Sequence, residues 1–209
     1  WYGYAEVAGD FFPTFHWAHD PTIIEEYSPD KAKALLAEAG YTAAKPLEFT
    51  LIPLNEPLQM DAAALIQTQL AKAGIKVNVR PMEYTATSAM MTKPFAEWQG
   101  HAILHRITPL RGTAYEFTYY QYGMDKGGTL NYEGYNRTPG AMNAAAEKLM
   151  KEANALSDFV EADRVKAKPM YQQLSKMIME DQPRIRVVWG YNLEVTSAAV
   201  MNWTLTEGD

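Results

Sequence analysis

Residues 27–41, with the sequence YSPDKAKALLAEAGY, contain the signals of a complete helix. Ser28 is a residue type that caps helix starts, and Pro29 is favoured at the first helical position. Asp30 places a carboxylate in the first turn, where the positive end of the helix dipole stabilises it. Gly40 tolerates the left-handed backbone that ends many helices. The stretch therefore predicts a helix that begins after Ser28 and ends at Gly40.

Strand and helix patterns alternate after this first helix. Its own apolar stripe consists of Leu35, Leu36 and Ala39. Residues 47–54 are a strand-like apolar run, residues 57–73 predict a second amphipathic helix that ends at Gly74, and residues 75–82 alternate as a second strand. The order is thus helix, strand, helix, strand.

The rest of the chain continues with both kinds of element. Residues 100–107 (GHAILHRI) are apolar on both faces, as expected for a strand buried between two helix layers. Pro169 is expected to kink the helix that contains it. Residues 114–134 are rich in tyrosine and show no regular pattern. The other expected elements are strands at 4–8, 184–191 and 195–205, and helices at 84–91, 138–156 and 158–180.

The composition limits the functions that the chain can have. Its 209 residues, 47% of them apolar, are enough for one well-packed domain or at most two small ones. The net charge of −6 argues against nucleic acid as a partner, because phosphate binding needs a basic face. The absence of cysteine excludes disulfides and thiolate metal sites. No apolar run approaches the roughly 18 residues that span a membrane.

Several short motifs, in a fixed order, resemble one known family. They are SPDKA at 28–32, LLAEAGY at 35–41, IQ at 66–67 with Leu70, AGIKV at 73–77, NYEGYN at 131–136 and IMEDQP at 178–183. Together they resemble the second lobe of the extracellular solute-binding proteins, family 5, of ABC transporters for dipeptides, oligopeptides and nickel. NYEGYN is similar to that family's Asn-x-x-Gly-Tyr-x-Asn-Pro turn, and IMEDQP is similar to its Glu-Asp-x-Pro before a strand.

The resemblance implies an α/β fold, a periplasmic-binding-protein-like lobe whose mixed sheet is flanked by helices. Residues 1–209 are expected to form a single domain, the C-terminal lobe of a two-lobed protein whose first lobe is absent. Because the chain starts at Trp1 without a leader, we expect it to be an excised lobe.

The resemblance also implies a function without catalysis. A small polar solute (peptide-like, an oligosaccharide or another anionic solute) would bind between the lobes and pass to the permease subunits of an ABC transporter. No cofactor is implied. The protein is expected to be a periplasmic or extracellular monomer that meets the membrane only through the transporter or a lipid anchor.

The first candidate ligand-binding residues lie at the end of the third predicted strand. Ligands of open α/β sheets bind beyond the carboxyl ends of the strands. If the sheet is parallel, this rule places His105, Arg106, Thr108 and Arg111 at the ligand cleft.

The residue types at this strand end depart from the family. Its peptide-binding members have an Asp here that accepts the α-ammonium group of the ligand, whereas residues 100–115 contain no carboxylate. Arg106 and Arg111 favour a carboxylate, phosphate or sugar-acid group instead, because guanidinium binds planar oxyanions through paired hydrogen bonds. The alternative is that these arginines pair with Glu116, Glu97 or the absent lobe.

Four further candidates come from aromatic segments and from the family turn. The resemblance places the N-terminal segment near the cleft, where Trp17 would contact the ligand; packing against a sheet edge is the alternative. Tyr119 is a candidate because tyrosine joins a flat apolar face to a polar tip, although tyrosines also close ordinary cores. Asn131 and Tyr135 belong to the turn that resembles the family motif.

His16, His19 and Asp20 are residue types that bind zinc or nickel. Pro13 and Pro21 bracket them, and no third ligand elsewhere in the sequence is identifiable. We therefore expect capping, packing or solvent-facing histidines here, and no metal site.

Two other functions remain as alternatives. A metal-dependent hydrolase would need one of His16, His19, His101 and His105 to act with a carboxylate, but the sequence has no Gly-x-Ser-x-Gly or His-Glu-x-x-His motif. A ligand-sensing domain of a cytoplasmic regulator would use the same fold.

Overall fold

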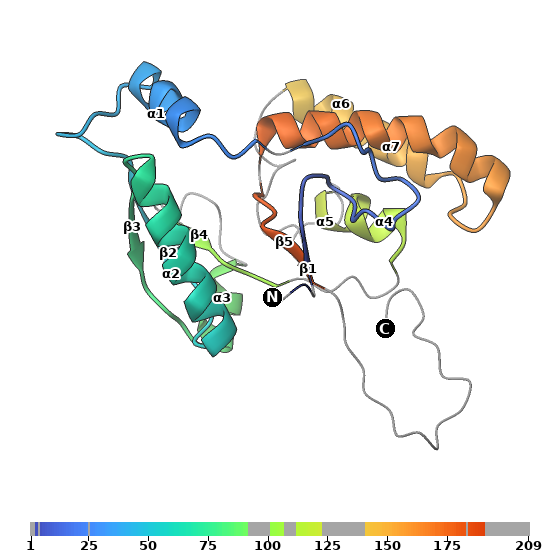
Figure 1. Ribbon diagram of the computed structural model, residues 1–209. Helices are drawn as coiled ribbons and strands as arrows, with labels where there is room; N and C mark the ends of the chain where they lie inside the picture. Colours follow the sequence, from blue (N-terminus) through green and yellow to red (C-terminus); the bar gives the residue numbers. More distant parts are fainter. Residues whose placement is uncertain are drawn as a thin grey trace. The chain divides into compact units, whose positions relative to one another are not determined.

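The computed structural model divides the chain into two compact units (Figure 1). The first unit consists of Trp1–Glu25 and Thr108–Asp209, and the second unit is Glu26–Ile107. The structure describes residues 3, 5–24, 26–91, 101–106, 112–122, 141–182 and 184–190. The single domain expected over residues 1–209 stays a prediction.

Helix α1, Pro29–Glu38, begins and ends where the sequence predicts. The Ser28 hydroxyl accepts a hydrogen bond from the backbone N–H of Lys31 at 3.3 Å, which makes Ser28 the N-cap. Gly40 follows with a φ of +85°. No residue of α1 is buried, and Leu35 is 54% exposed. Within the described part of the second unit, the predicted apolar stripe therefore covers no core.

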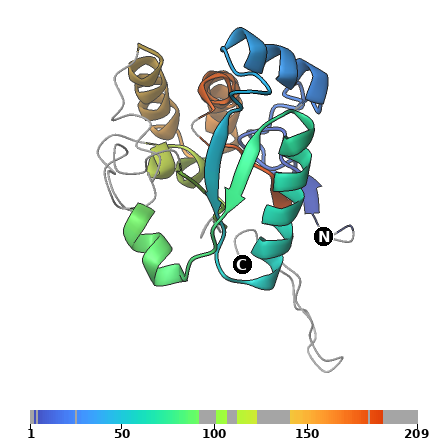
Figure 2. The same cartoon turned by 90° about the vertical axis from the view of Figure 1, so that its left-hand side faces the viewer.

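A three-stranded parallel sheet forms the centre of the second unit. Its strands are β2 (Glu48–Ile52), β3 (Lys76–Val79) and β4 (His101–Ile103), in the order β3-β2-β4. Helix α2 (Pro57–Lys72) connects β2 to β3, and helix α3 (Tyr84–Met91) follows β3. In the view of Figure 2 the strands lie between α2 and α3. The sequence predicts all five elements, although β4 is shorter than the pattern indicates.

Successive side chains of a strand point to opposite faces of this sheet. On one face Leu51 and Val77 form a buried cluster with Ala63 of α2. On the other face Glu48 is paired in register with Lys76, whose Nζ lies 2.9 Å from Glu48 Oε1. Asn78 Nδ2 donates to the same oxygen at 2.7 Å. The face that α2 covers is therefore apolar, whereas the opposite face is polar at Glu48 and buried at Ile52, which is 0% exposed.

Two long helices dominate the first unit. Helices α6 (Ala141–Asn154) and α7 (Glu161–Asp181) pack against one another (Figure 1). Strands β1 (Ala5–Val7) and β5 (Val188–Gly190) form an antiparallel pair. These four elements are predicted from the sequence. Pro169 lies inside α7, and the kink predicted there stays a prediction.

Two short helices occupy part of the tyrosine-rich segment that the sequence predicts to be irregular. They are α4 (Ala114–Phe117) and α5 (Tyr119–Tyr122), so the prediction is wrong for residues 114–122. The physical reason is that the side chains of Phe117, Tyr119 and Tyr122 are buried and order the backbone. We define the aromatic core of the first unit as Phe11, Phe12, Phe117, Tyr119, Tyr122 and Tyr171.

The predicted α/β class is confirmed. Parallel and antiparallel strand pairs are both present, and among the described strands they belong to separate sheets. No helix in the described residues is long and apolar enough to cross a membrane. The strand expected at 195–205 lies outside the described residues.

Gly40→Ala and Gly74→Ala are each expected to lower the free energy of unfolding by about 1 kcal/mol. The φ angles are +85° and +84°, and a Cβ added at either glycine meets no atom within 4 Å. The cost therefore comes from the backbone alone and should be the same at both positions. Urea denaturation measures it. One variant as stable as the unmodified protein, or costs that differ clearly between the two, would contradict this explanation.

Candidate functional site

The carboxyl ends of β2, β3 and β4 lie at one edge of the sheet, because the three strands are parallel. The parallel arrangement of strands, on which the predicted site after β4 depends, is therefore present. The chain passes from β2 to β3 on one side and then to β4 on the other, so its direction across the sheet reverses between β2 and β4. Ligands of open α/β sheets bind at such a reversal. We define residues 53–56, 80–83 and 104–106 as the carboxyl edge.

Asn55 and Glu83 are brought together at the carboxyl edge. An isolated bridge between Leu54 and Met82 extends the pairing of β2 and β3. The side-chain amide of Asn55 then donates to Glu83 Oε1 at 2.9 Å. The Glu83 carbonyl accepts hydrogen bonds from the backbone N–H and the hydroxyl of Thr87, at 3.0 and 3.1 Å. Glu83 is therefore held at the start of α3, with its carboxylate at the ends of the strands.

Gln59 shapes the turn that follows β2. Its side chain is 9% exposed, and its Oε1 accepts a hydrogen bond from the backbone N–H of Leu54 at 2.9 Å. This contact joins the first turn of α2 to the end of the strand. It supports the segment that carries Asn55.

His105 and Arg106 directly follow the paired part of β4. The backbone N–H of Leu104 donates to Ile52 O at 2.9 Å, so His105 is the first residue beyond this ladder contact. Arg106 is exposed. It forms no ion pair with the carboxylates that the structure describes in the second unit. An arginine in this state is able to bind a solute anion.

Glu97 and Glu116 were the alternative ion-pair partners of Arg106 and Arg111, and neither is a described residue of the second unit. Glu97 lies outside the described residues, and Glu116 belongs to the first unit. Thr108 and Arg111 also lie outside the described residues, so their roles stay predictions.

Glu83 changes the charge balance predicted for this edge. The absence of a carboxylate holds for residues 100–115, but Glu83 lies two strands away from β4, roughly 10 Å by the usual strand spacing. The argument against an ammonium group on the ligand was therefore incomplete. Sequence reasoning missed Asn55 and Glu83, although each is the first residue after a predicted strand and the carboxyl-edge rule applies to both.

Trp17 and Tyr119 belong to the first unit, whereas the carboxyl edge belongs to the second unit. The Trp17 ring makes an edge contact with Tyr171 at 5.5 Å, and the Arg164 guanidinium lies 5.8 Å from its centroid. Tyr119 is 8% exposed and belongs to the aromatic core. Both side chains therefore have a packing role, and ligand contact stays a prediction. Asn131 and Tyr135 lie outside the described residues.

His16 is buried against Phe12 and Phe117 of the aromatic core. It is 7% exposed and stacks on Phe12 with ring centroids 4.6 Å apart. Its Nδ1 accepts from the backbone N–H of Ala18 at 3.1 Å, so the proton is on Nε2, which lies 3.1 Å from Gly112 O. Burial lowers the pKa of His16 to about 4, although the hydrogen bond to Gly112 acts in the opposite direction.

His19 and Asp20 are also engaged in structural contacts. His19 Nδ1 lies 2.9 Å from Asp10 Oδ2, and the same oxygen accepts from the backbone N–H of Asp20 at 2.7 Å. Asp20 in turn accepts from Thr22 and pairs with Lys176 at 3.1 Å. The residues that the structure describes contain no group of three or more metal-binding side chains.

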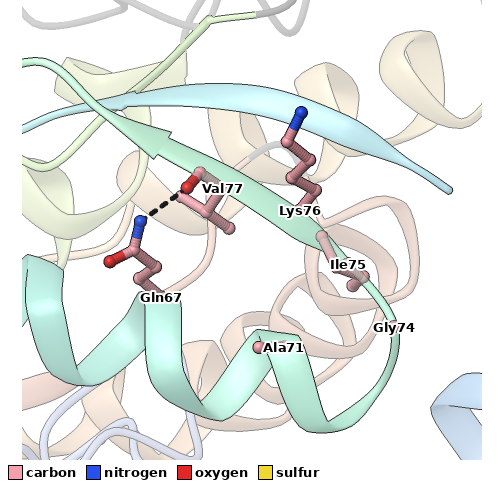
Figure 3. Close-up of a pocket in the computed structure, with 6 residues that line it drawn as sticks. All are labelled: Gln67, Ala71, Gly74, Ile75, Lys76 and Val77. Carbon is pink, nitrogen blue, oxygen red and sulfur yellow. Dashed lines mark hydrogen bonds between the residues drawn. The ribbon is translucent and has the colours of Figure 1, made fainter.

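An open pocket lies at the opposite end of β3 from the carboxyl edge (Figure 3). Gln67 reaches from α2 and donates through Nε2 to Val77 O at 2.7 Å. Lys76, the one charged residue lining the pocket, pairs with Glu48. The lining residues are Gln67, Ala71, Gly74, Ile75, Lys76 and Val77. This hollow holds no convergent polar groups, so the carboxyl edge is the better candidate site.

The chain matches one family over more than half of its length. The family described as bacterial extracellular solute-binding proteins, family 5 Middle, matches residues 1–129. This range includes the three parallel strands and the whole carboxyl edge.

Two curated relatives are similar to most of the chain. The oligopeptide-binding protein AppA of Bacillus subtilis (strain 168) is 32% identical over 169 residues, which are 76% of this chain and 28% of AppA. The dipeptide-binding protein of Pseudomonas aeruginosa PAO1 is 26% identical over 185 residues, 87% of this chain and 32% of that protein. The chain thus spans about a third of the length of these relatives.

Solved structures show the same fold. AppA of Bacillus subtilis in complex with a nonapeptide has a TM-score of 0.68 at 28% identity, with 90% of this chain and 37% of AppA covered. NikA of Staphylococcus aureus in complex with Ni(L-His)2 has a TM-score of 0.72 at 22% identity, with the same coverage of 90% and 37%. The second likeness is one of fold alone.

Proposed function

This chain belongs to the bacterial extracellular solute-binding proteins of family 5, and we propose on this premise that it is part of the solute-binding component of an ABC importer. The observation that carries the proposal is the family match over residues 1–129, since these residues contain the parallel sheet and its carboxyl edge. The protein would act in the periplasm or outside the cell, as a soluble or lipid-anchored monomer. It would deliver its solute to the permease subunits of the transporter.

We propose that the solute binds at the carboxyl edge and carries an anionic group. Arg106 is exposed there and has no ion pair with a described carboxylate of its unit, and Arg111 would add a second guanidinium. Glu83, held by Asn55, supplies a negative charge at the same edge. A small solute with both charges, such as a peptide, therefore fits this edge as well as a purely anionic one.

Delivery would use closure of two lobes, of which residues 1–209 would form one. A solute that contacts both lobes makes all of its hydrogen bonds only in the closed state, so binding shifts the population towards closure. No catalytic step, metal or cofactor is part of this proposal. The hydrolase and sensor alternatives are not favoured, because the relatives similar to this chain are named as binding proteins.

Native mass spectrometry of the full-length protein that contains this chain, purified from its own cells, tests the function. A bound small molecule is expected, because closed receptors release their solute slowly. The added mass would identify the class of solute. An empty protein that also gains no thermal stability from peptides, oligosaccharides and sugar acids would overturn the proposal.

Arg106→Ala is expected to weaken binding of the retained solute by roughly tenfold or more, since hydrogen bonds to a charged group are among the stronger ones. Calorimetric titration of the full-length protein measures the change. Lys72→Ala is the control, because Lys72 is an exposed cation in the last turn of α2 and lies outside the carboxyl edge. Equal affinities for Arg106→Ala and the unmodified protein would remove Arg106 from the site.

A further inference from the structure

Two buried hydrogen-bond donors in the first unit have no acceptor. They are Arg186 Nη1 and the indole Nε1 of Trp189. Both atoms are inaccessible to solvent, and neither forms a hydrogen bond. Buried donors without a partner are rare in folded proteins, because each loses its hydrogen bonds to water without replacement. The two residues lie three apart in the chain, where β5 begins.

The surroundings of Arg186 leave one part of its guanidinium group unused. Its Cζ lies 4.2 Å from the centroid of the Phe11 ring and 5.9 Å from that of Trp189. Its Nη2 donates to the Tyr122 hydroxyl at 3.0 Å. Aromatic rings therefore cover the guanidinium group and a tyrosine occupies one nitrogen, while Nη1 remains without an acceptor. Because Cζ is close to the indole ring, the two unpaired donors belong to one region.

The positive charge of Arg186 has no counter-ion among the described residues. No carboxylate among the described residues pairs with Arg186. Arg184 adds a second guanidinium, which lies 5.4 Å from the Tyr122 ring and donates to Gln121 Oε1. A buried charge is costly unless it is paired and hydrogen-bonded, and contacts with aromatic faces replace only part of its hydration. An anion that accepts hydrogen bonds would satisfy both donors and balance the charge of Arg186.

We propose that Arg186 and Trp189 bind the carboxylate group of a small molecule in the first unit. A carboxylate has two oxygens in one plane, which matches a guanidinium N–H and an indole N–H as separate donors. This site lies in a different unit from Arg106, and it does not depend on the transport role, since the donors lack acceptors whatever the protein delivers. A carboxylate from the protein's own chain would have the same chemistry, and the experiment separates the two sources.

The test compares the melting temperature of the full-length protein in sodium acetate, in acetamide and in sodium chloride at the same ionic strength as the acetate. Acetate is expected to raise the melting temperature above its value in chloride, whereas acetamide, which has a similar shape but no charge, is not. Arg186→Met should weaken the apparent affinity for acetate roughly tenfold or more. Arg186→Lys keeps the charge but loses the planar fork, so it should also reduce the acetate effect.

The control is Arg184→Met, which removes a neighbouring guanidinium that has other partners and should keep most of the acetate effect. The stability of Arg186→Met without acetate identifies the source of the carboxylate. Removal of an uncompensated buried charge should leave the melting temperature unchanged or raise it. A lower melting temperature together with no acetate effect in the unmodified protein would mean that Arg186 pairs within the chain, and would overturn the proposal. No acetate effect in the unmodified protein would overturn it whatever the variant does.

Discussion

Asp10→Ala is expected to lower the free energy of unfolding by about 3 to 5 kcal/mol. Asp10 is 1% exposed, and its carboxylate accepts hydrogen bonds from the backbone N–H groups of Phe11 and Asp20 and contacts His19 Nδ1. Alanine would leave two buried N–H donors without their acceptor, while His19 Nδ1 would keep only its contact with Phe12 O at 3.2 Å. Since the cost of an unsatisfied buried donor is about 1 to 3 kcal/mol, the two lost acceptors explain the size of the effect. Urea denaturation at neutral pH measures it.

Two control variants separate the network of Asp10 from the loss of a charge. Asp10→Asn keeps the volume and one acceptor oxygen, so it should cost clearly less than Asp10→Ala. Asp30→Ala removes a carboxylate that is 96% exposed in the first turn of α1, and its effect should stay within about 0.5 kcal/mol. Equal effects of Asp10→Ala and Asp30→Ala would show that the buried contacts of Asp10 do not stabilise the protein.

The helices of the second unit are predictable because their signals are local. Ser28 caps α1 and Gly40 follows its end, and both are adjacent in sequence to the backbone that they order. The same holds for Gly74 after α2. The location of Arg106 is also predictable, because the order of elements favours a parallel sheet and the site then follows from the rule for carboxyl ends.

Contacts between distant residues are the part that the sequence does not show. Asn55 and Glu83 are 28 residues apart, and only the register of β2 and β3 brings their side chains within 2.9 Å. Gln172 Nε2 donates to His19 O across 153 residues. Asp10, the centre of a buried polar network, has no motif around it and was not a candidate residue. Helices α4 and α5 were missed for a related reason, since burial in the aromatic core orders them.

The stability of the protein is expected to fall between pH 6.5 and about pH 4 because of His16. Burial lowers the pKa of His16 from 6.5 to about 4 in the folded protein. Above pH 6.5 the imidazole is neutral in both states, so its full contribution is present. As the pH falls from 6.5 to about 4, the unfolded chain binds a proton that the folded protein does not, and stability is lost. The total loss from this group is on the order of 3 kcal/mol, and it does not grow further below that window.

The matched variant for this pH effect is His16→Gln, which is neutral throughout the window. Its amide oxygen and N–H are suited to replace the contacts of His16 with Ala18 N–H and Gly112 O. Other groups titrate equally in the two proteins, so the difference between their free energies of unfolding, measured by urea denaturation, isolates His16. The unmodified protein should lose more stability than the variant as the pH falls from 7 to 4. Parallel pH profiles would mean that His16 binds its proton as readily in the folded protein as in the unfolded chain. Burial against the aromatic core would then not keep His16 neutral.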